Sequence, residues 1–311
     1  MTLAQLQYFK TLAHVLHYTR AAEALHIAQP SLSYSINELE KELGVKLFTK
    51  EDRKILLTMY GEQFLPYVET ALATLSDGTQ ALQQMAGSSY QIVRLGYFLS
   101  IASSLIPSMM DGLYRSEENQ RLRFQFSEAG SPDLLNELKK GNLDLAFCMH
   151  QDDTIASVPV LEQPLYLVVP IDHPFAKREA VSLEDFAQEP IAMLDKTSSL
   201  RSRVDALYAE SGLTPNTIFV VRECHAAMQY VALRLCVSIL PQLPAMDAEK
   251  VKAIPIVWNG GTLSRTVFFS WEKNRTLPPA VRRVRNYIVD HFALPAAQMR
   301  TSSAAADKAR A

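Results

Sequence analysis

A cluster of amide and hydroxyl side chains follows a short polar segment near the N-terminus; its members are Gln29, Ser31, Ser33, Tyr34 and Asn37. These groups can hydrogen-bond to base edges and to phosphate oxygens. Pro30 is typical of the first turn of a helix, and Gly44 of the residue that ends one. Polar groups near a helix N-terminus also benefit from the positive end of the helix dipole. The cluster therefore indicates a helix whose first turns can contact DNA.

Two further helices are expected to position this segment. Apolar residues at intervals of three and four predict an opening helix; they are Leu3, Leu6, Phe9, Leu12, Ala13 and Leu16. A short second helix follows, with Thr19 as its N-cap, and a turn at 26–28 separates it from the third. Two short helices joined by a tight turn are typical of a helix-turn-helix. The same spacing would also satisfy a small helical bundle without a DNA-binding role.

Residues 46–50 and 55–58 are expected to form two short strands joined by a polar turn. Lys50, Arg53 and Lys54 would then lie on a β-hairpin wing, where they could contact the phosphate backbone. A solvated basic hairpin is the alternative interpretation.

The combined pattern resembles the winged helix-turn-helix of the LysR-type transcriptional regulators. The matching residues are Thr19 to His26, Gln29 to Ser33, Leu39-Glu40, Leu43-Gly44, Leu47-Phe48, Arg53, Leu57-Thr58 and Gly61. The resemblance implies a recognition helix that begins near Gln29, and phosphate contacts near Arg20, Lys50 and Arg53. Lys50 stands where arginine is commoner in the family, which keeps the charge but loses the forked donor geometry. The candidate DNA-binding residues are Thr19, Arg20, Gln29, Pro30, Ser31, Ser33, Tyr34, Asn37, Lys50, Arg53 and Thr58.

A heptad-like apolar pattern follows Gly61; its positions are Phe64, Val68, Ala71, Leu75, Leu82 and Met85, with Gly78 at the intervening step. Such a stripe could pack on its own domain. The resemblance instead implies a linker helix that pairs with a second subunit, and this is the interpretation we favour. Gly87-Ser88-Ser89 is typical of a flexible junction.

Beyond residue 90, short apolar strands alternate with helical segments, which predicts a mostly parallel α/β fold. The order resembles the two-lobed, periplasmic-binding-protein-like effector domain of the same family. The expected domains are a winged helix-turn-helix at 1–61, a linker helix at 62–88, an effector-binding domain at 89–295 and a disordered tail at 296–311. Within the effector domain, we expect lobe I at 89–161 and 265–295 and lobe II at 162–264.

Ligands of open α/β sheets bind at the carboxyl ends of strands and at helix N-termini. The candidate effector-binding residues are accordingly Leu99, Ser100, Ser131, Thr197, Ser198, Ser199 and Cys224, and the family resemblance implies that they line the cleft between the lobes. Each hydroxyl alone is more commonly a simple helix cap. Hydroxyls and helix N-termini together favour a small polar or carboxylate metabolite.

One position departs from the family. Arg234 stands in place of a glycine within a run that is usually glycine-rich. Arginine does not adopt a positive φ freely, so either the turn differs or Arg234 adds a charge near the cleft.

Composition excludes several other classes. With 311 residues, 48% hydrophobic content and a net charge of −2, the chain cannot bind DNA by bulk positive charge. Walker, GxGxxG, HExxH and nucleophile-elbow motifs are absent, so neither an enzyme nor a cofactor is expected. His14 and His17 share the spacing of a metal pair, but without partners they are expected to be surface residues. Cys148, Cys224 and Cys236 are expected to be buried thiols, with a redox sensor as the alternative.

The N-terminus lacks the pattern of a secretory signal, which predicts a cytoplasmic protein without a membrane segment. The resemblance implies as partners double-stranded DNA with an inverted repeat, a small-molecule effector, further copies of the chain in a homodimer or homotetramer, and RNA polymerase.

Overall fold

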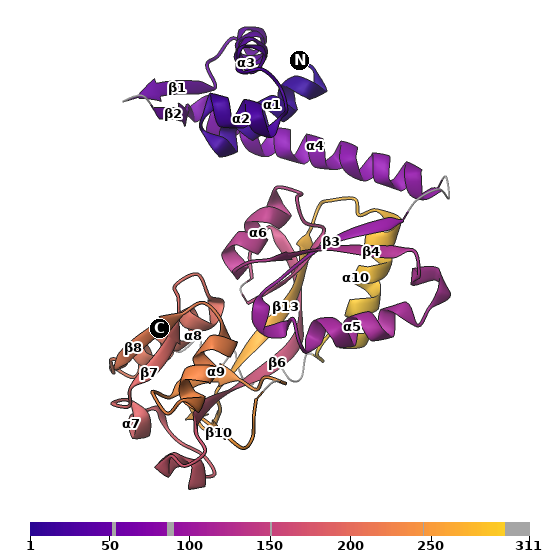
Figure 1. Cartoon of the computed structure of the whole chain (residues 1–311). Coiled ribbons are helices and arrows are strands. Elements are labelled where there is room, and N and C mark those ends of the chain that lie inside the picture. The colour runs from indigo at the N-terminus through magenta and orange to yellow at the C-terminus, as the bar shows by residue number, and fades with distance from the viewer. Residues whose placement is uncertain (52–53, 86–89, 150, 245, 296–311) are drawn as a thin grey trace. The chain divides into compact units, whose positions relative to one another are not determined.

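A computed structural model describes residues 1–51, 54–85, 90–149, 151–244 and 246–295. The chain divides into two compact units, one built mainly from Met1–Ser89 and the other mainly from residues after Tyr90. Arg53, the expected junction at 87–89 and the expected tail at 296–311 lie outside the described residues. The elements of both units are labelled in Figure 1.

The first unit consists of three short helices, a two-stranded hairpin and a long helix. The elements are α1 (Leu3–Val15), α2 (Tyr18–Ala24), α3 (Gln29–Leu43), β1 (Phe48–Glu51), β2 (Lys54–Leu57) and α4 (Met59–Met85). The Phe9 ring lies at the centre of the core, 5.6 Å from that of Phe48 and 5.5 Å from that of Phe64. Leu12, Leu32 and other apolar side chains complete the cluster. The expected helix-turn-helix and wing are both present, and α4 begins at Met59 rather than at residue 62.

The ends of these helices are set by local hydrogen bonds. Thr2 forms a capping box with Gln5, and Gly44 ends α3 in the left-handed conformation with φ 72°. The expected N-cap at Thr19 is wrong. The ring of His17 accepts the hydrogen bond from the amide of Arg20, so α2 begins at Tyr18 and Thr19 belongs to its first turn.

A buried glutamate attaches the wing to α3. One carboxylate oxygen of Glu40 accepts hydrogen bonds from the amides of Leu47 and Phe48 at 2.8 and 3.2 Å, and the other lies 2.6 Å from the ammonium of Lys46. Glu40 therefore couples the position of the wing to α3. Gly61 completes the junction, because a Cβ there would lie 2.2 Å from the carbonyl oxygen of Leu47.

The second unit is an α/β structure of two lobes. Its elements are β3 (Gln91–Tyr97), η1 (Leu99–Ile101), α5 (Leu105–Tyr114), η2 (Glu117–Asn119), β4 (Leu122–Glu128), α6 (Ser131–Lys139), β5 (Leu145–Cys148), β6 (Ile155–Pro170), η3 (Pro174–Lys177), α7 (Leu183–Phe186), β7 (Ile191–Leu194), α8 (Ser199–Glu210), β8 (Thr217–Val221), α9 (Cys224–Ala232), β9 (Ser238–Pro241), β10 (Val251–Pro255), β11 (Val257–Trp258), β12 (Gly261–Thr262), β13 (Ser264–Glu272) and α10 (Pro279–Phe292).

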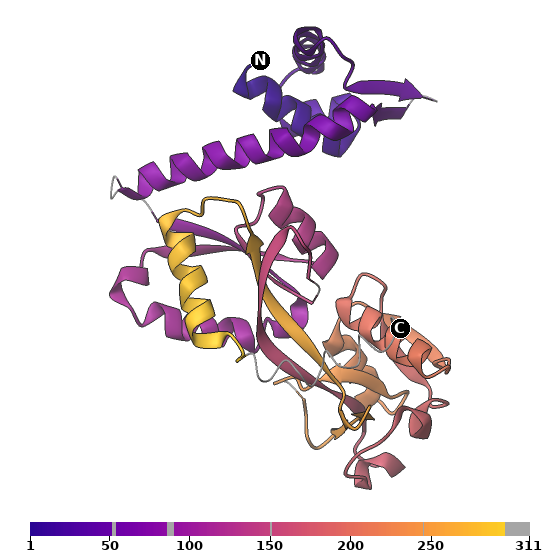
Figure 2. The ribbon, with the colours of Figure 1, turned by 180° about the vertical axis from the view of Figure 1, so that it is seen from behind.

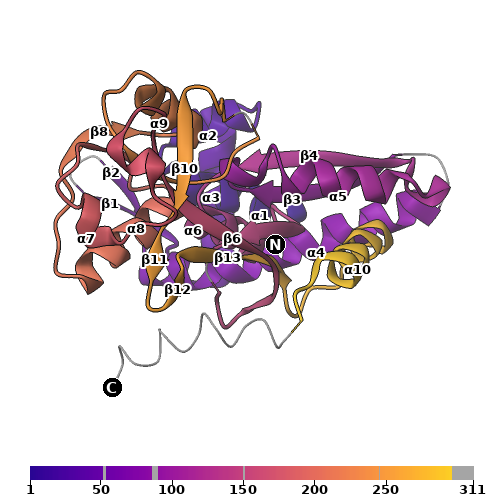
Figure 3. The ribbon, with the colours of Figure 1, turned by 90° about the horizontal axis from the view of Figure 1, so that it is seen from below.

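Strands β6 and β13 cross between the lobes. They pair antiparallel from Ser264↔Pro164 to Glu272↔Ile155, and they lie side by side in Figures 2 and 3. In lobe I, β3 pairs in parallel with β4 and β5, and β13 joins β5 antiparallel. In lobe II, β6 pairs with β9 and β10, and β7 pairs in parallel with β8. The expected two-lobed α/β fold is confirmed.

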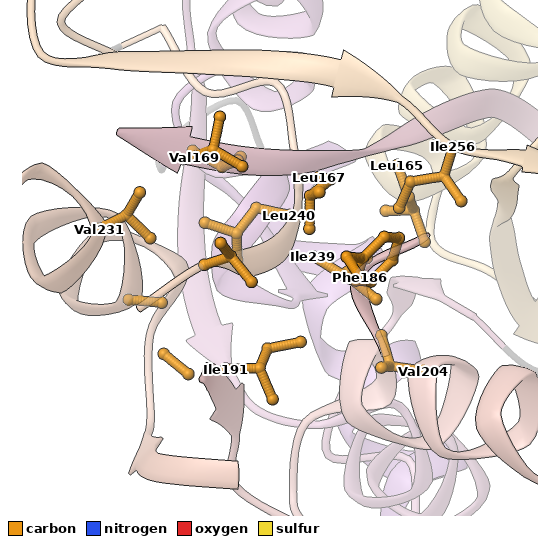
Figure 4. Packing of buried hydrophobic residues seen from close by; sticks show 14 of the residues in the cluster. Leu165, Leu167, Val169, Phe186, Ile191, Val204, Val231, Ile239, Leu240 and Ile256 are labelled. Atoms are coloured by element: carbon orange, nitrogen blue, oxygen red, sulfur yellow. The ribbon is translucent and has the colours of Figure 1, made fainter. Parts of the chain in front are cut away.

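The core of lobe II lies between its strands and the helices α7, α8 and α9. Figure 4 shows Leu167, Phe186, Val204, Val231 and Leu240, which all pack into this cluster. Strand residues with inward-facing aliphatic side chains thus hold the helices. Because α8 follows β7 and α9 follows β8, and these strands are parallel, both helices begin beyond the carboxyl ends of the strands. This packing positions the loops that precede α8 and α9.

The turn after α9 keeps the left-handed geometry despite its arginine. Arg234 has φ 62°, and its guanidinium pairs with the carboxylate of Asp172 at 2.7 Å. Hydrogen bonding to Arg234 is the main reason why the pKa of Asp172 is lowered. Of the two alternatives for Arg234, an altered turn is therefore not observed, and the side chain lies at an exposed ion pair instead of lining the pocket described below.

Candidate functional sites

The first turns of α3 present polar side chains to solvent. Gln29, Pro30, Ser31, Tyr34 and Asn37 are exposed, while Ser33 is half-buried. The opposite face is fixed in the core by three apolar residues, Leu32, Ile36 and Leu39. The N-cap Ala28 has no side chain that caps the helix, Pro30 has no amide hydrogen, and the amides of Ser31 and Leu32 donate to the carbonyl of Ala28, which leaves the amide of Gln29 and the helix dipole for an outside partner. Such an N-terminus favours an anionic partner such as a DNA phosphate.

The expected phosphate-contacting residues differ in their surroundings. Thr19, Arg20 and Lys50 are exposed, as is Lys54 on the other strand of the wing. The Thr58 hydroxyl, in contrast, donates to the carbonyl of Lys46 at 2.6 Å and accepts from the amide of Gly61 at 3.1 Å. Thr58 therefore joins the wing to α4, and the DNA contact expected for it from sequence stays a prediction.

The apolar stripe of α4 divides into two parts. Phe64 and Val68 pack against the core of their own unit. Leu75 and Leu82 are 55% and 68% exposed. The part of the stripe with Phe64 and Val68 is thus packed within the chain, whereas the part with Leu75 and Leu82 leaves large apolar side chains in contact with water.

Most of the residues expected to bind an effector line one pocket between the lobes, with a volume of about 350 Å³. It is lined by Phe98, Leu99, Ser100, Glu128, Ala129, Gly130, Leu194, Thr197, Ser198, Ser199, Leu200, Arg222, Glu223, Cys224 and Arg265. Six of the seven residues expected from sequence are among them. The N-termini of α8 and α9 both border the pocket, because Ser199 and Cys224 are their first residues.

Arg265 is the buried cation of this pocket. It lies on β13 and is 4% exposed. Its Nε and Nη2 donate to the amide oxygen of Gln163 at 2.8 and 2.6 Å, and Nη2 also donates to the hydroxyl of Ser100. The guanidinium lies 5.2 Å from the centre of the Phe98 ring. Burial lowers the pKa of Arg265 to about 10, which still leaves it protonated at neutral pH.

The surroundings of Arg265 contain no ion-pair partner. Its neighbours are neutral oxygens, and none of the ion pairs within the described part of the chain includes this arginine. A buried charge without a counter-charge is costly unless a partner binds. The Arg265 side of the pocket is therefore electrostatically suited to an anion.

Ser131 was expected to line the pocket, but it is not among the lining residues. It is fully buried, and its hydroxyl accepts hydrogen bonds from the Ser199 hydroxyl at 2.9 Å and from the amide of Met149 at 2.8 Å. Beside it, a Cβ on Gly130 would lie 2.4 Å from the carbonyl oxygen of Thr197. The Ser131–Ser199 pair thus connects the N-terminus of α6 in lobe I to that of α8 in lobe II.

Sequence reasoning missed Arg265, Gln163 and Glu128. A signal for Arg265 was present in the alternation of β13, where Val267 and Phe269 are buried and Arg265 occupies the same face. A charged residue at an inward-facing strand position indicates a special role. Gln163 gave no comparable signal, since its function depends on the pairing of β6 with β13.

The three cysteines are buried, as expected. Burial raises the pKa of the Cys148 thiol to about 12 and those of Cys224 and Cys236 to about 11. Thiols with such pKa values carry little thiolate at neutral pH and react slowly with oxidants.

The two histidines expected at the surface have structural partners. His14 lies 2.8 Å from the carboxylate of Glu69 on α4, and His17 caps α2. The described residues contain no group of three or more His, Cys, Asp or Glu side chains arranged to bind a metal ion. Among the described helices, none combines the length and apolar character of a membrane span.

Each of the two units matches a known protein family model. Residues 3–62 match the model of the bacterial regulatory helix-turn-helix proteins of the lysR family, and residues 87–293 match the LysR substrate binding domain. The HTH-type transcriptional regulator YybE of Bacillus subtilis is 34% identical, with 94% of this chain and 99% of YybE covered. The hydrogen peroxide-inducible genes activator of Dickeya chrysanthemi is 28% identical, with 81% of this chain and 82% of the activator covered.

A solved structure resembles the second unit. The effector-binding domain of QuiR, in complex with shikimate, is 25% identical with a TM-score of 0.60, and the match covers 66% of this chain and all of the domain. The relatives are regulators rather than enzymes. The protein belongs to the LysR family of DNA-binding transcriptional regulators, with an N-terminal helix-turn-helix domain and a C-terminal effector-binding domain.

Proposed function

We propose that the chain regulates transcription in response to a small carboxylate, which binds between the lobes with its negative charge on Arg265. The single observation that carries the proposal is a buried arginine that lines the pocket without a carboxylate partner. Nε and Nη2 of Arg265 already donate to Gln163 and Ser100, so Nη1 is the donor of this guanidinium that is left for a ligand carboxylate among the bonds that the structure describes. The cost of burying Arg265 is then offset when the ligand is bound.

Neutral donors would complete the site. Ser100, Thr197 and Ser198 line the pocket, and the N-termini of α8 and α9 add amide groups and the positive ends of their dipoles. The Thr197 hydroxyl already donates to the carboxylate of Asp195 at 2.5 Å, so Ser100 and Ser198 are the hydroxyl donors proposed for the ligand. The relative QuiR was solved with shikimate, a hydroxylated carboxylate, in its effector-binding domain. This kind of ligand agrees with the chemistry of the lining residues.

Binding would alter DNA recognition by favouring one arrangement of the lobes. The Ser131–Ser199 pair and the close approach of Gly130 to Thr197 belong to the arrangement described above. A ligand that contacts both Ser100 in lobe I and Ser199 in lobe II has different affinities for different arrangements, which is the requirement for regulation.

At the DNA, we propose that two copies paired through α4 place two recognition helices on an inverted repeat, as a homodimer or as half of a homotetramer. The residues that would contact DNA are those exposed on α2, α3 and the wing, with Arg53 added from sequence. We also propose the domain boundaries 1–61, 62–88 and 89–295, a cytoplasmic location because the target is DNA, and a contact with RNA polymerase as the step that changes transcription.

A response to peroxide is the second candidate, because relatives include hydrogen peroxide-inducible activators. The thiols argue against it. All three cysteines are buried and have raised pKa values, which is opposite to the low pKa and access that a redox-sensing thiol requires.

The test is calorimetry on the full-length protein with shikimate and a panel of small carboxylates. Arg265→Gln should weaken binding of an active carboxylate by about 2–5 kcal/mol, at least about 30-fold, since one partner of a buried charge pair is removed. Arg265→Lys should retain part of the affinity. Arg178→Gln removes an exposed arginine paired with Asp185 and serves as the matched control. Equal affinity of the parent and Arg265→Gln would contradict the proposal.

A further inference from the structure

Two glutamates from opposite lobes face the same pocket as Arg265. Glu128 is the last residue of β4 in lobe I, and Glu223 is the N-cap residue of α9 in lobe II. Neither carboxylate forms a hydrogen bond or an ion pair with another residue in the part of the chain that the structure describes. The pocket therefore contains two carboxylates that can bind a cationic group, in addition to the buried guanidinium of Arg265.

The remaining charge in the lining does not neutralise these glutamates. Arg222 is highly exposed, and its Nε lies 3.7 Å from the carboxylate of Asp195. Arg265 donates to Gln163 and Ser100. A plain carboxylate bound to Arg265 would add negative charge to a pocket whose lining already contains two carboxylates, one from each lobe, and like charges repel.

We infer that the effector is a zwitterion, with a carboxylate bound by Arg265 and a protonated amine held between Glu128 and Glu223. The inference rests on the proposed function, since it assumes that Arg265 binds the effector's carboxylate. An α-amino acid, or another small metabolite with both groups, has this chemistry. The buried guanidinium, two helix N-termini and several hydroxyls serve the acidic group, whereas the two glutamates serve the basic group.

The placement of the glutamates also gives the amine a regulatory role. Without a cation between them, the two carboxylates oppose any arrangement that brings their lobes together. An ammonium group that contacts both reverses this effect, because it attracts lobe I through Glu128 and lobe II through Glu223. The amine would therefore distinguish a ligand that stabilises one lobe arrangement from one that merely occupies the pocket.

The experiment compares matched pairs of ligands on the full-length protein. The probes are the common L-amino acids and, for each, the 2-hydroxy acid with the same carbon skeleton, measured by calorimetry near neutral pH. The amino acid of the active pair should bind about tenfold or more tightly than its hydroxy acid, as expected for a charge-assisted hydrogen bond. Glu128→Gln and Glu223→Gln should each remove about tenfold of the amino acid's affinity and should raise the affinity of the hydroxy acid.

Glu179→Gln is the matched control, because Glu179 is exposed in lobe II and does not line the pocket. All three glutamates are exposed, so folding should be unaffected, and thermal unfolding of each variant verifies this. A hydroxy acid that binds as tightly as its amino acid, or glutamine variants that bind the amino acid like the parent, would overturn the inference while the carboxylate proposal stands. Failure of both members of every pair to bind the parent would contradict the carboxylate proposal as well.

Discussion

The two candidate sites of this chain are built in opposite ways. The DNA-binding candidates come from one stretch near the N-terminus, are mostly exposed, and depend on a core formed by their own neighbours in sequence. The pocket residues come from segments between Phe98 and Arg265, and its central cation is buried. A site of the first kind can be recognised from a local motif, while a site of the second kind is defined by which strands pair.

The largest expected effect concerns the exposed part of α4. Aspartate at both Leu75 and Leu82 should prevent pairing of α4, because two charges would have to be buried in an apolar contact. Sedimentation should show a lower oligomer mass, and DNA affinity should fall by about 10²–10⁴-fold as bivalent binding is lost. Leu233→Asp changes an equally exposed leucine after α9 and is the control. An unchanged mass in the double variant would move the subunit contact elsewhere.

Substitution of Glu40 should have the next largest effect, on the free energy of unfolding. It tests whether the N-terminal domain is stabilised by contacts between residues close in sequence. Glu40→Ala leaves the buried amides of Leu47 and Phe48 without acceptors and should lower the free energy of unfolding by about 3 kcal/mol. Urea unfolding measures this change. Glu38→Ala, which removes an exposed carboxylate 3.8 Å from Lys41, should cost no more than about 0.5 kcal/mol. Similar losses in both variants would show that the wing is not held by Glu40.

The sequence predicted the N-terminal domain in detail because each of its features has a local cause. Pro30 and Gly44 delimit α3, and the apolar spacing of α1 and α3 defines the core. The error at Thr19 arose because the His17 ring can also cap a helix, which the residue type alone does not indicate. Thr58 has a residue type common in DNA contacts, but its hydroxyl is used between the wing and α4.

The pocket was only partly predictable. Ser100, Thr197 and Ser199 were found because strand ends and helix starts follow from local patterns. Their partners were not, since the contact of Arg265 with Gln163 depends on the register of β13 against β6. Ser131 was assigned to the ligand because a hydroxyl at a helix start suits one, whereas its bond to Ser199 depends on how the two lobes meet.

Substitutions at the expected DNA-contacting residues should have a smaller effect on DNA affinity, and they distinguish contacts to bases from contacts to phosphates. Gln29→Ala and Ser33→Ala should weaken specific binding by about 1–2 kcal/mol each and non-specific binding much less. Lys50→Ala, and Arg53→Ala on sequence grounds, should weaken both kinds alike and reduce the salt dependence. Competition binding on specific and random duplexes measures the ratio. Equal losses of specific and non-specific binding in all four variants would contradict a base-recognition role for α3.

The smallest expected effect is at Arg234. Glycine adopts φ 62° without strain, so Arg234→Gly should change the free energy of unfolding by less than about 1 kcal/mol, in the stabilising direction. The lost ion pair with Asp172 is exposed and offsets little of this gain. Asp172→Asn removes the ion pair alone and isolates its contribution. A clear destabilisation by Arg234→Gly that Asp172→Asn does not reproduce would show that the arginine has another structural role.

The central claim is that the pocket around Arg265 controls how the N-terminal domain binds DNA. Nuclease protection of the target promoter, with and without a saturating active carboxylate or amino acid, tests it on the full-length protein. We expect the ligand to change the protected region for the parent and to leave it unchanged for Arg265→Gln, while both proteins bind the inverted repeat without ligand. A ligand-induced change of the same extent in Arg265→Gln, or no change in the parent under saturating ligand, would contradict the account.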